Sequence, residues 1–436
     1  MNRYERYKDS GIPWLGEIPE HWNICRLKDE VTFNDEVLGD KTDADYEILY
    51  VDISSVSLIE GIVQKEPMSF ENSPSRARRI VKNGDVIVST VRTYLKAITQ
   101  IQDAEDNLIV STGFAVLRPK ENLFPRFLGY WVQAENMIGA IVSNSVGVSY
   151  PAINATDLVR LPIVKLPLKE QTAIAHYLDT KLGEIDALID KQQTLLEKLA
   201  EQRTAVITQA VTKGLNPAAP MKKSGVEWLG DVPAHWDVSP FKLVMNSIID
   251  YRGKTPEKTN SGVFLITARN IKNGIIDYTL SQEFINEDNY EEVMRRGLPK
   301  LGQVLMTTEA PLGEVAQIDR TDVALAQRVL KFDGKKDKLD NRFLKYFILS
   351  KAFQASLYKF ATGSTALGIK SERLSYLKSL LPPVTEQTKI ANYLDQETVK
   401  IDRLCETVNQ TIGRLKEYRT ALITQAVTGK IKVTNE

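Results

Sequence analysis

Two separate stretches of the chain carry an apolar residue at alternating steps of four and three positions. A spacing of about 3.5 residues that persists over several heptads is typical of a coiled coil. Pro167 lies near the start of the first stretch, and Gly214 and Gly429 follow the two stretches, so each predicted helix has about 43 residues and a length of about 65 Å. A single apolar stripe usually marks a core helix, but two copies separated by a whole domain favour pairing with each other. The predicted seam consists of Leu178, Leu182, Ile185, Ile189, Leu196 and Leu199 in the first helix and Leu394, Ile401, Cys405, Val408, Ile412 and Leu415 in the second.

These helices belong to an internal repeat that organises the whole chain. Residues 10–22 and 224–236 share Trp-Leu-Gly, Pro and His-Trp at an offset of 214. Residues 170–215 and 386–431 are identical at 22 of 46 positions, without a gap, at an offset of 216. The chain therefore has the order A–B–A′–B′, in which each B block is a helix.

The A blocks are predicted to be mixed α/β domains. Residues 46–56, 85–91 and 108–117 are rich in β-branched and aromatic residues, which predicts short strands. Helices are expected at 124–142 and, in the second copy, at 340–360. The fold class that follows is α+β: two globular mixed α/β domains joined by two long helices. The predicted boundaries are 1–165 and 216–381 for the domains and 166–215 and 382–436 for the helical segments.

The two A blocks have diverged far more than the B blocks. Residues 127–130 still match residues 343–346, and the Gly-Val-Ser sequence at 147–149 matches Gly-Ser-Thr at 363–365. Matching folds with different surfaces are what we expect when one scaffold recognises two different ligands.

Composition narrows the class of protein without giving its function. The chain has 56 basic and 56 acidic residues, so its formal net charge is zero, which argues against a binder that works by bulk positive charge. Cys25 and Cys405 are too few for a disulfide framework. The N-terminus resembles no signal peptide, and no apolar run approaches the ~18 residues of a membrane span, so we expect a cytoplasmic protein.

The sequence contains no complete catalytic or metal-binding pattern. Residues 363–371 approach a phosphate-binding loop, but Ile369 displaces the lysine from the position that the loop requires. The three histidines offer no metal pair, because His21 and His235 are repeat equivalents and His176 is isolated on a helix. We therefore expect neither a catalytic residue nor a metal ligand, and predict that the chain is not an enzyme by itself.

Two basic clusters are the strongest binding feature. Residues 75–96 have a local net charge of +5 and residues 251–272 a local net charge of +4, with tyrosine and hydroxyl side chains interleaved. A solvated face explains one such cluster, but two in corresponding halves favour nucleic acid, because basic groups contact phosphates while Arg, Asn, Ser and Thr can also contact base edges. The predicted DNA-binding residues are Arg76, Arg78, Arg79, Arg92, Tyr94, Lys96, Ser149, Arg252, Lys254, Thr255, Arg269, Asn270, Lys272, Thr365 and Lys370.

The repeated motifs resemble a known family. The opening Ser-Gly-x-x-Trp-Leu-Gly-x-x-Pro-x-His-Trp, the helix start Glu-Gln-x-x-Ile-Ala-x-Tyr-Leu-Asp and the A–B–A′–B′ order are similar to those of the specificity (S) subunit of Type I restriction–modification systems. Residues 251–256 are also similar to a segment common in the target domains of that family. The resemblance covers nearly the whole chain, and both motifs occur twice in the expected order.

The resemblance implies a function and a set of partners. The A blocks are expected to be target recognition domains that bind the two halves of a bipartite double-stranded DNA site. The B helices are expected to pair as an antiparallel coiled-coil spacer with an approximate two-fold axis. Two methyltransferase (modification) subunits would contribute S-adenosylmethionine binding, and restriction/translocase subunits would contribute ATP and Mg, so no cofactor is expected on this chain.

Two other classes of protein are alternatives for a chain with this repeat. A coiled-coil interaction scaffold with two ligand-binding heads predicts no affinity for DNA and no dependence of binding on salt. A complete nuclease or methyltransferase predicts activity from the purified chain.

Overall fold

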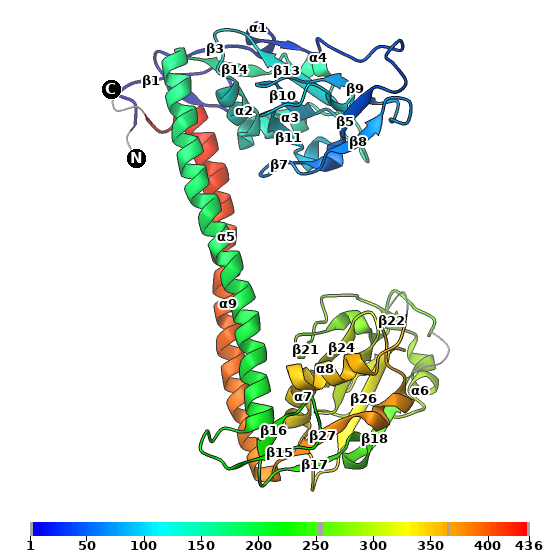
Figure 1. Cartoon of the computed structure of the whole chain (residues 1–436). Coiled ribbons are helices and arrows are strands. Elements are labelled where there is room, and N and C mark those ends of the chain that lie inside the picture. The colour runs from blue at the N-terminus through cyan, green and yellow to red at the C-terminus, as the bar shows by residue number, and fades with distance from the viewer. Residues whose placement is uncertain (1–2, 252–255, 364–366, 434–436) are drawn as a thin grey trace. The chain divides into compact units, whose positions relative to one another are not determined.

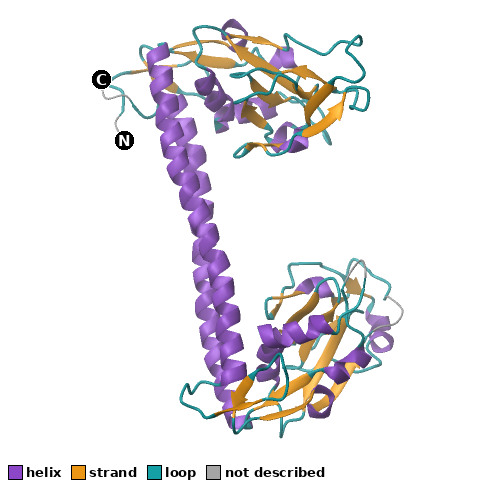
Figure 2. Ribbon diagram, viewed as in Figure 1, coloured by secondary structure: helices purple, strands orange, loops and turns teal. Residues whose placement is uncertain are grey.

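The computed structural model describes residues 3–251, 256–363 and 367–433. The chain forms two compact units, Met1–Gln192 with Gln410–Glu436, and Gln193–Asn409. Each unit contains one globular α/β domain and part of each long helix (Figures 1 and 2). The α+β class expected from the sequence is confirmed.

The two long helices are α5 (Leu168–Lys213) and α9 (Val384–Val427). Each begins directly after a proline, and an acidic residue, Glu170 or Glu386, lies in its first turn, where the helix dipole favours negative charge. Gly214 and Gly429 follow the two ends with φ angles of +77° and +71°, a backbone conformation that glycine adopts without strain. Neither these helices nor any other helix among the described residues has the apolar content of a membrane span.

Within each unit the helices pair in antiparallel fashion, as the resemblance implied (Figure 1). In the first unit, residues near the start of α5 share a hydrophobic core with residues near the end of α9, including Leu178 and Leu422. In the second unit, the end of α5 and the start of α9 share a core that includes Ile207 and Leu394. All the predicted seam residues are buried or half-buried: Leu178, Leu182, Ile185, Ile189, Leu196, Leu199, Leu394, Ile401, Cys405, Val408, Ile412 and Leu415.

The first domain is built on two four-stranded sheets. One has the strand order β11-β10-β13-β4 and is antiparallel; the other has the order β8-β5-β12-β9, with β5 and β12 parallel. The strands are β4 (Val31–Phe33), β5 (Glu47–Val51), β8 (Glu66–Ser69), β9 (Ala77–Ile80), β10 (Val86–Ser89), β11 (Ile98–Gln100), β12 (Leu108–Ser111) and β13 (Phe114–Pro119). The two-residue strands β6 (Val56–Ser57) and β7 (Gly61–Ile62) form a hairpin, β3 (Asn23–Arg26) pairs with β14 (Pro162–Lys165), and α1 (Leu27–Glu30) and α4 (Ala155–Leu158) are single turns.

The second domain repeats this arrangement. Its sheets have the orders β18-β26-β23-β24 and β22-β19-β25, and β19 and β25 are again parallel. The strands are β18 (Met245–Asp250), β19 (Val263–Ile266), β22 (Phe284–Ile285), β23 (Val304–Thr308), β24 (Leu312–Gln317), β25 (Val323–Leu325) and β26 (Val329–Gly334). The hairpin β20 (Ile271–Lys272) and β21 (Ile275–Ile276) corresponds to β6 and β7, β17 (Asp237–Pro240) pairs with β27 (Lys378–Leu381), and α6 (Tyr290–Val293) is short.

The predicted helix at 124–142 is two helices, and so is the one at 340–360. The first pair is α2 (Pro125–Gln133) and α3 (Glu135–Ser143), and the second is α7 (Asn341–Leu349) and α8 (Lys351–Lys359). The break frees the first N–H of α3, which donates to the hydroxyl of Thr424 on α9 at 3.0 Å. The first N–H of α8 donates to Thr208 on α5 at 2.9 Å. The break therefore attaches each domain to a long helix, and this tertiary contact has no signature in local periodicity.

The repeated sequence motifs meet in space. They form the hairpins β1 (Tyr7–Asp9) with β2 (Glu17–Pro19) and β15 (Met221–Lys223) with β16 (Asp231–Pro233). The buried Trp22 indole donates to Glu170 at 3.1 Å, and the buried Trp236 indole donates to Glu386 at 3.2 Å. The opening motif also lies against Gly429 at the end of α9, as the second motif lies against Gly214 at the end of α5. Each motif therefore packs where the start of one long helix meets the end of the other.

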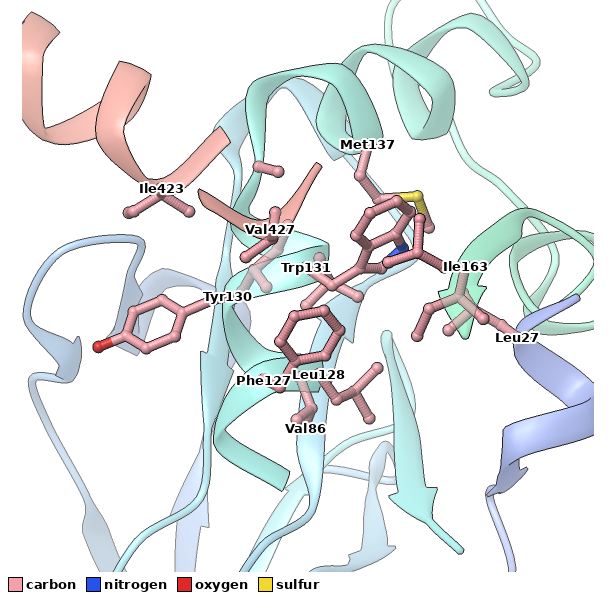
Figure 3. Close-up of a cluster of buried hydrophobic side chains, with 14 of the residues drawn as sticks. Leu27, Val86, Phe127, Leu128, Tyr130, Trp131, Met137, Ile163, Ile423 and Val427 are labelled. Atoms are coloured by element: carbon pink, nitrogen blue, oxygen red, sulfur yellow. The ribbon is translucent and has the colours of Figure 1, made fainter. Parts of the chain in front are cut away.

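The core of the first unit joins the domain to the helix pair. Phe127, Leu128 and Trp131 of α2 pack between the sheet and the end of α9, which contributes Ile423 and Val427 (Figure 3). All five side chains are at most 3% exposed. Because the same core holds strand and coiled-coil residues, the first domain and its part of the helix pair form one packed unit.

Candidate nucleic-acid interface

One backbone arrangement follows the central strand β10 of the first domain. The N–H of Thr90 donates to Gly113 O at 2.8 Å, and the carbonyl of Thr90 accepts from Ile153 N–H at 2.9 Å. Val91, the next residue, forms a β-bridge with Ala152. These bonds hold three loops together, residues 90–96, 112–113 and 145–153, which we call the first rim.

The same arrangement follows β23 of the second domain. The N–H of Thr308 donates to Arg328 O at 2.8 Å, and Thr308 O accepts from Ile369 N–H at 3.0 Å. Glu309 forms a β-bridge with Gly368. Residues 308–312, 327–328, 362 and 368–370 therefore form a second rim at the corresponding place in the repeat.

The two rims share their backbone bonds but not their side chains. Val91 in the first rim corresponds to Glu309 in the second, and Gly113 corresponds to Arg328. Gly113 is constrained by its own surroundings, because a Cβ built there would lie 2.6 Å from the Ile53 side chain. Gly113 lies in the turn that divides the predicted strand at 108–117 into two strands, β12 and β13.

The first rim presents basic and aromatic side chains. The guanidinium of Arg92 lies 4.8 Å from the centroid of the Tyr150 ring, a cation–π arrangement. The buried Thr93 hydroxyl is 2.9 Å from that of Ser145, which ties the turn that carries Arg92 to the neighbouring loop. Large exposed side chains complete this surface: Tyr94, Leu95, Val146, Val148 and Tyr150.

Four predicted DNA-binding residues come together on the first rim. Arg92, Tyr94 and Lys96 lie on one turn, and Ser149 lies on the loop that carries Tyr150; all four are exposed. Sequence reasoning missed Tyr150, although an aromatic residue after the matched Gly-Val-Ser sequence is a recognisable signal.

The other arginines of the first cluster occupy different environments. Arg76 donates to the Tyr50 hydroxyl at 3.1 Å and to Asp52 at 2.7 Å, and these contacts raise the pKa of its guanidinium. Arg78 lies over the Phe70 ring, 4.4 Å from its centroid. Both are therefore held by groups of their own domain.

Arg79 is half-buried, and its Nε lacks a hydrogen-bond partner among the described residues. Burial lowers the pKa of its guanidinium. Successive residues of a strand point to opposite faces, so the arginines on β9 do not all face one surface. The run at 75–96 is thus several local sites: Arg76 is exposed but paired with Asp52, whereas Arg92 is exposed beside the Tyr150 ring.

In the second cluster, Arg269 and Lys272 are exposed, but Asn270 is fully buried. Its side-chain oxygen accepts from the N–H and hydroxyl of Thr267, both at 2.9 Å, and its amide nitrogen donates to Asp277 O at 3.0 Å. The prediction that Asn270 contacts DNA is therefore wrong for this structure, because its amide already closes a turn.

The remaining predicted residues divide into two groups. Lys370 is exposed on the second rim and lines a cavity of about 290 Å³ with Glu309 and Arg328. Four predicted residues lie outside the described residues: Arg252, Lys254, Thr255 and Thr365.

The second rim has an ion pair that the sequence did not indicate. Arg328 Nε lies 2.6 Å from Glu309 Oε1, and the two side chains are 53% and 38% exposed. Arg328 has a φ of +73°, which is uncommon for a residue with a side chain. Its partner lies 19 positions away in the chain, so only the folded domain brings the two together.

Neither rim has the composition of a metal site. Within the described ranges, no group of three or more His, Cys, Asp or Glu side chains is placed to hold a metal ion. The exposed groups are hydrogen-bond donors, one carboxylate, aromatic rings and aliphatic side chains. Such a set can contact phosphates and base edges.

Comparisons with known proteins identify the family. The sequence model of the type I restriction modification DNA specificity domain matches residues 19–198 and 233–414. The putative type I restriction enzyme MjaX specificity subunit of Methanocaldococcus jannaschii is 24% identical over 451 residues, with 96% of each chain covered. The EcoKI specificity subunit of Escherichia coli is 23% identical over 327 residues, which cover 72% of this chain and 68% of that protein.

Solved structures share the fold. The HsdS subunit from Thermoanaerobacter tengcongensis has a TM-score of 0.53 at 22% identity, covering 95% of this chain and 98% of that chain. A chain from a structure that describes complex assembly and conformational transition of the type I R-M system has a TM-score of 0.72, also at 22% identity, covering 95% and 99%. Because the two family matches span most of the sequence, the chain belongs to the type I restriction–modification DNA specificity family, as a DNA-recognition subunit with two copies of the specificity domain.

Proposed function

We propose that the first and second rims contact the two halves of a bipartite, asymmetric DNA site. The observation that carries this proposal is the shared backbone of the rims beneath different side chains, Val91 and Gly113 against Glu309 and Arg328. A common backbone places both rims against DNA in the same way, and different side chains then select different bases.

Charge and aromatic surface support the first rim as a contact. Arg92 and Lys96 are exposed cations on one turn, suited to phosphates of the DNA backbone. Tyr94 and Tyr150 flank them with planar rings, and Val146 and Val148 add aliphatic surface. Apolar groups of this kind can contact the methyl group of thymine in the major groove.

The helix pair is proposed to be the platform for partner subunits. The antiparallel pairing inside each unit gives the platform two equivalent halves, which suits two identical partners. We propose that two methyltransferase subunits bind there and contribute S-adenosylmethionine, and that restriction subunits contribute ATP and Mg. This chain then recognises DNA in the cytoplasm without catalysing a reaction itself.

Neutralising the first rim tests the DNA contact. The double variant Arg92→Gln/Lys96→Gln should weaken binding of the full chain, with its partner subunits, to its DNA site. Each phosphate contact that is lost should reduce the slope of log K against log salt by about one unit, so the slope should fall by about two units. Lys28→Gln changes an exposed lysine of α1, outside both rims and outside the long helices, and serves as the control.

An unchanged affinity and slope in the double variant, equal to those of the control, would show that the first rim does not contact DNA.

A second experiment tests whether the chain is catalytic by itself. The purified chain, incubated with S-adenosylmethionine and DNA but without partner subunits, should transfer no methyl group, and transfer above background would contradict the proposal.

A further inference from the structure

The ion pair between Glu309 and Arg328 is unusual for a surface that meets DNA. A carboxylate faces the negative potential of the phosphates, so it weakens binding unless a donor group of the DNA compensates it. In the major groove, the donors are the amino groups of cytosine and adenine. Arg328 already offsets the charge of Glu309, and the bases from which its carboxylate can accept a hydrogen bond are those with an exocyclic amino group.

Arg328 restricts the choice further. Its guanidinium has parallel N–H donors, and the commonest specific partner of an arginine is guanine, through O6 and N7. The guanidinium and the carboxylate lie 2.6 Å apart at their nearest atoms, close enough to meet the two bases of one pair or of adjacent pairs. A G·C pair presents two acceptors on guanine beside one donor on cytosine, which matches an arginine beside a glutamate.

We infer that Arg328 and Glu309 select a G·C base pair in the half-site of the second domain, Arg328 at guanine and Glu309 at the amino group of cytosine. This inference rests on the proposed function of the second rim. The first rim, which has Gly113 and Val91 at the corresponding places, does not impose this requirement on the other half-site.

The structure supplies a variant that should keep the fold. Glu309→Val/Arg328→Gly transfers the side chains of the first rim to the second. Glycine suits the φ of +73° at position 328, and the 38% and 53% exposure of the two side chains means that little core packing is lost. Arg320→Gln is the matched control, because Arg320 also forms an ion pair, with Asp322, on the surface of the same domain.

The full chain with its partner subunits is used to select DNA from a randomised library. The wild type should enrich a bipartite sequence. In one of its two halves, the preference for one G·C pair should depend on residue 328. The double variant should lose the preference at that pair, which we expect to be roughly tenfold to a hundredfold in the wild type, and keep every other position. Replacing that guanine by 7-deazaguanine, which lacks N7, should weaken binding of the wild type but not of the variant.

The other outcomes separate failure of this inference from failure of the proposed function. If the double variant enriches the same sequence as the wild type, or relaxes a position that is not a G·C pair, the inference is overturned and the proposed function stands. If Arg320→Gln relaxes the same pair, the effect is not specific to the second rim and the inference is also overturned. If the wild type enriches no sequence, the proposed function fails and the inference fails with it.

Discussion

Arg419 of α9 donates from Nε to Asp186 of α5 at 3.0 Å in the first unit. The second unit has the same contact with the helices exchanged, between Arg203 of α5 and Asp402 of α9. Both arginines continue the spacing of the predicted seam, four residues after Leu199 and Leu415 respectively. Polar residues at a seam define the register of paired helices, so the two contacts fix how the antiparallel helices align within each unit.

Removing the carboxylate of Asp186 should destabilise the pairing of α5 with α9 in the first unit. Asp186→Ala leaves Arg419, which is 8% exposed, without its ionic partner. Because the Asp186 side chain is itself 42% exposed, we expect a loss of about 1–2 kcal/mol in the free energy of unfolding. Asp402→Ala should cost less, since Arg203 also donates to Asn273 O at 3.1 Å. Chemical denaturation measures both, with Glu197→Ala, an exposed site on α5, as the control; a loss no larger than that of the control would show that the contact does not fix the register.

Two neighbouring residues of the second domain, Asn270 and Arg269, should differ in their effects on stability and on DNA binding. Asn270→Ala removes a buried amide whose oxygen accepts two hydrogen bonds from Thr267 and whose nitrogen donates to Asp277 O, so the free energy of unfolding should fall by about 2 kcal/mol. Arg269→Ala changes an exposed side chain and should alter stability by less than about 0.5 kcal/mol while weakening DNA binding. Thermal or chemical unfolding and a DNA-binding assay of both variants separate the roles. A stable Asn270→Ala protein would restore Asn270 as a candidate DNA contact.

The contrast between Asn270 and Arg269 shows what can be predicted from the sequence and what depends on the fold. Local composition identified the segment, and the heptads and repeats predicted the helices and the order of domains, because periodicity is a property of neighbouring positions. Which side chain of a polar segment turns inward depends on tertiary bonds such as that from Asn270 to Asp277. Likewise, the pair of Glu309 with Arg328 exists only because two loops 19 residues apart meet at the end of β23.

Two glycines of the second half should respond in opposite directions to alanine. A Cβ at Gly429 would overlap the ring of Pro19 and lie 3.0 Å from Trp22, at a φ of +71°, so Gly429→Ala should loosen the opening motif from the end of α9. Gly413 is exposed within α9, and a Cβ there meets nothing within 4 Å. Gly413→Ala should therefore raise the free energy of unfolding by about 0.5–1 kcal/mol through helix propensity. Denaturation curves of the two variants check both signs, and a stabilised Gly429→Ala protein would contradict the packing described for the motif.

Stability should depend on pH through Lys331. Its side chain is 1% exposed and donates to Gly297 O at 3.1 Å and to Leu298 O. Burial lowers its pKa to about 8 from 10.5, with Lys300 adding to the decrease and Asp333 opposing it. Between these two values the unfolded chain holds a proton that the native chain has lost, so stability rises with pH; below about pH 8 both states are protonated and this dependence ends.

The comparison with Lys331→Met isolates this group. From pH 7.5 to 9.5, the free energy of unfolding of the wild type should rise by about 1–2 kcal/mol relative to the variant. Lys336→Met, at an exposed site nearby, should follow the wild type. Parallel curves for the wild type and Lys331→Met would show that the buried lysine does not lose its proton in this range.

Only some of the cations in the basic cluster at residues 75–96 are exposed and without an ion-pair partner among the described residues. Net charge over residues 75–96 identified the turn with Arg92 and Lys96, but it could not separate these cations from Arg76, whose charge is matched by Asp52, 24 positions away in the chain. The strength of a charged surface depends on such pairings, which a count along the chain does not contain.

Exchange of one domain tests the central claim most directly. Residues 23–165 of this chain are replaced by the matching domain of another family member, and adenine methylation is read by long-read sequencing in cells that also carry the methyltransferase subunits. If each rim contacts its own half-site, the methylated sequence should change in one half and keep the other, and replacement of residues 237–381 should change the opposite half. A change in both halves from a single exchange would contradict independent recognition by the two domains.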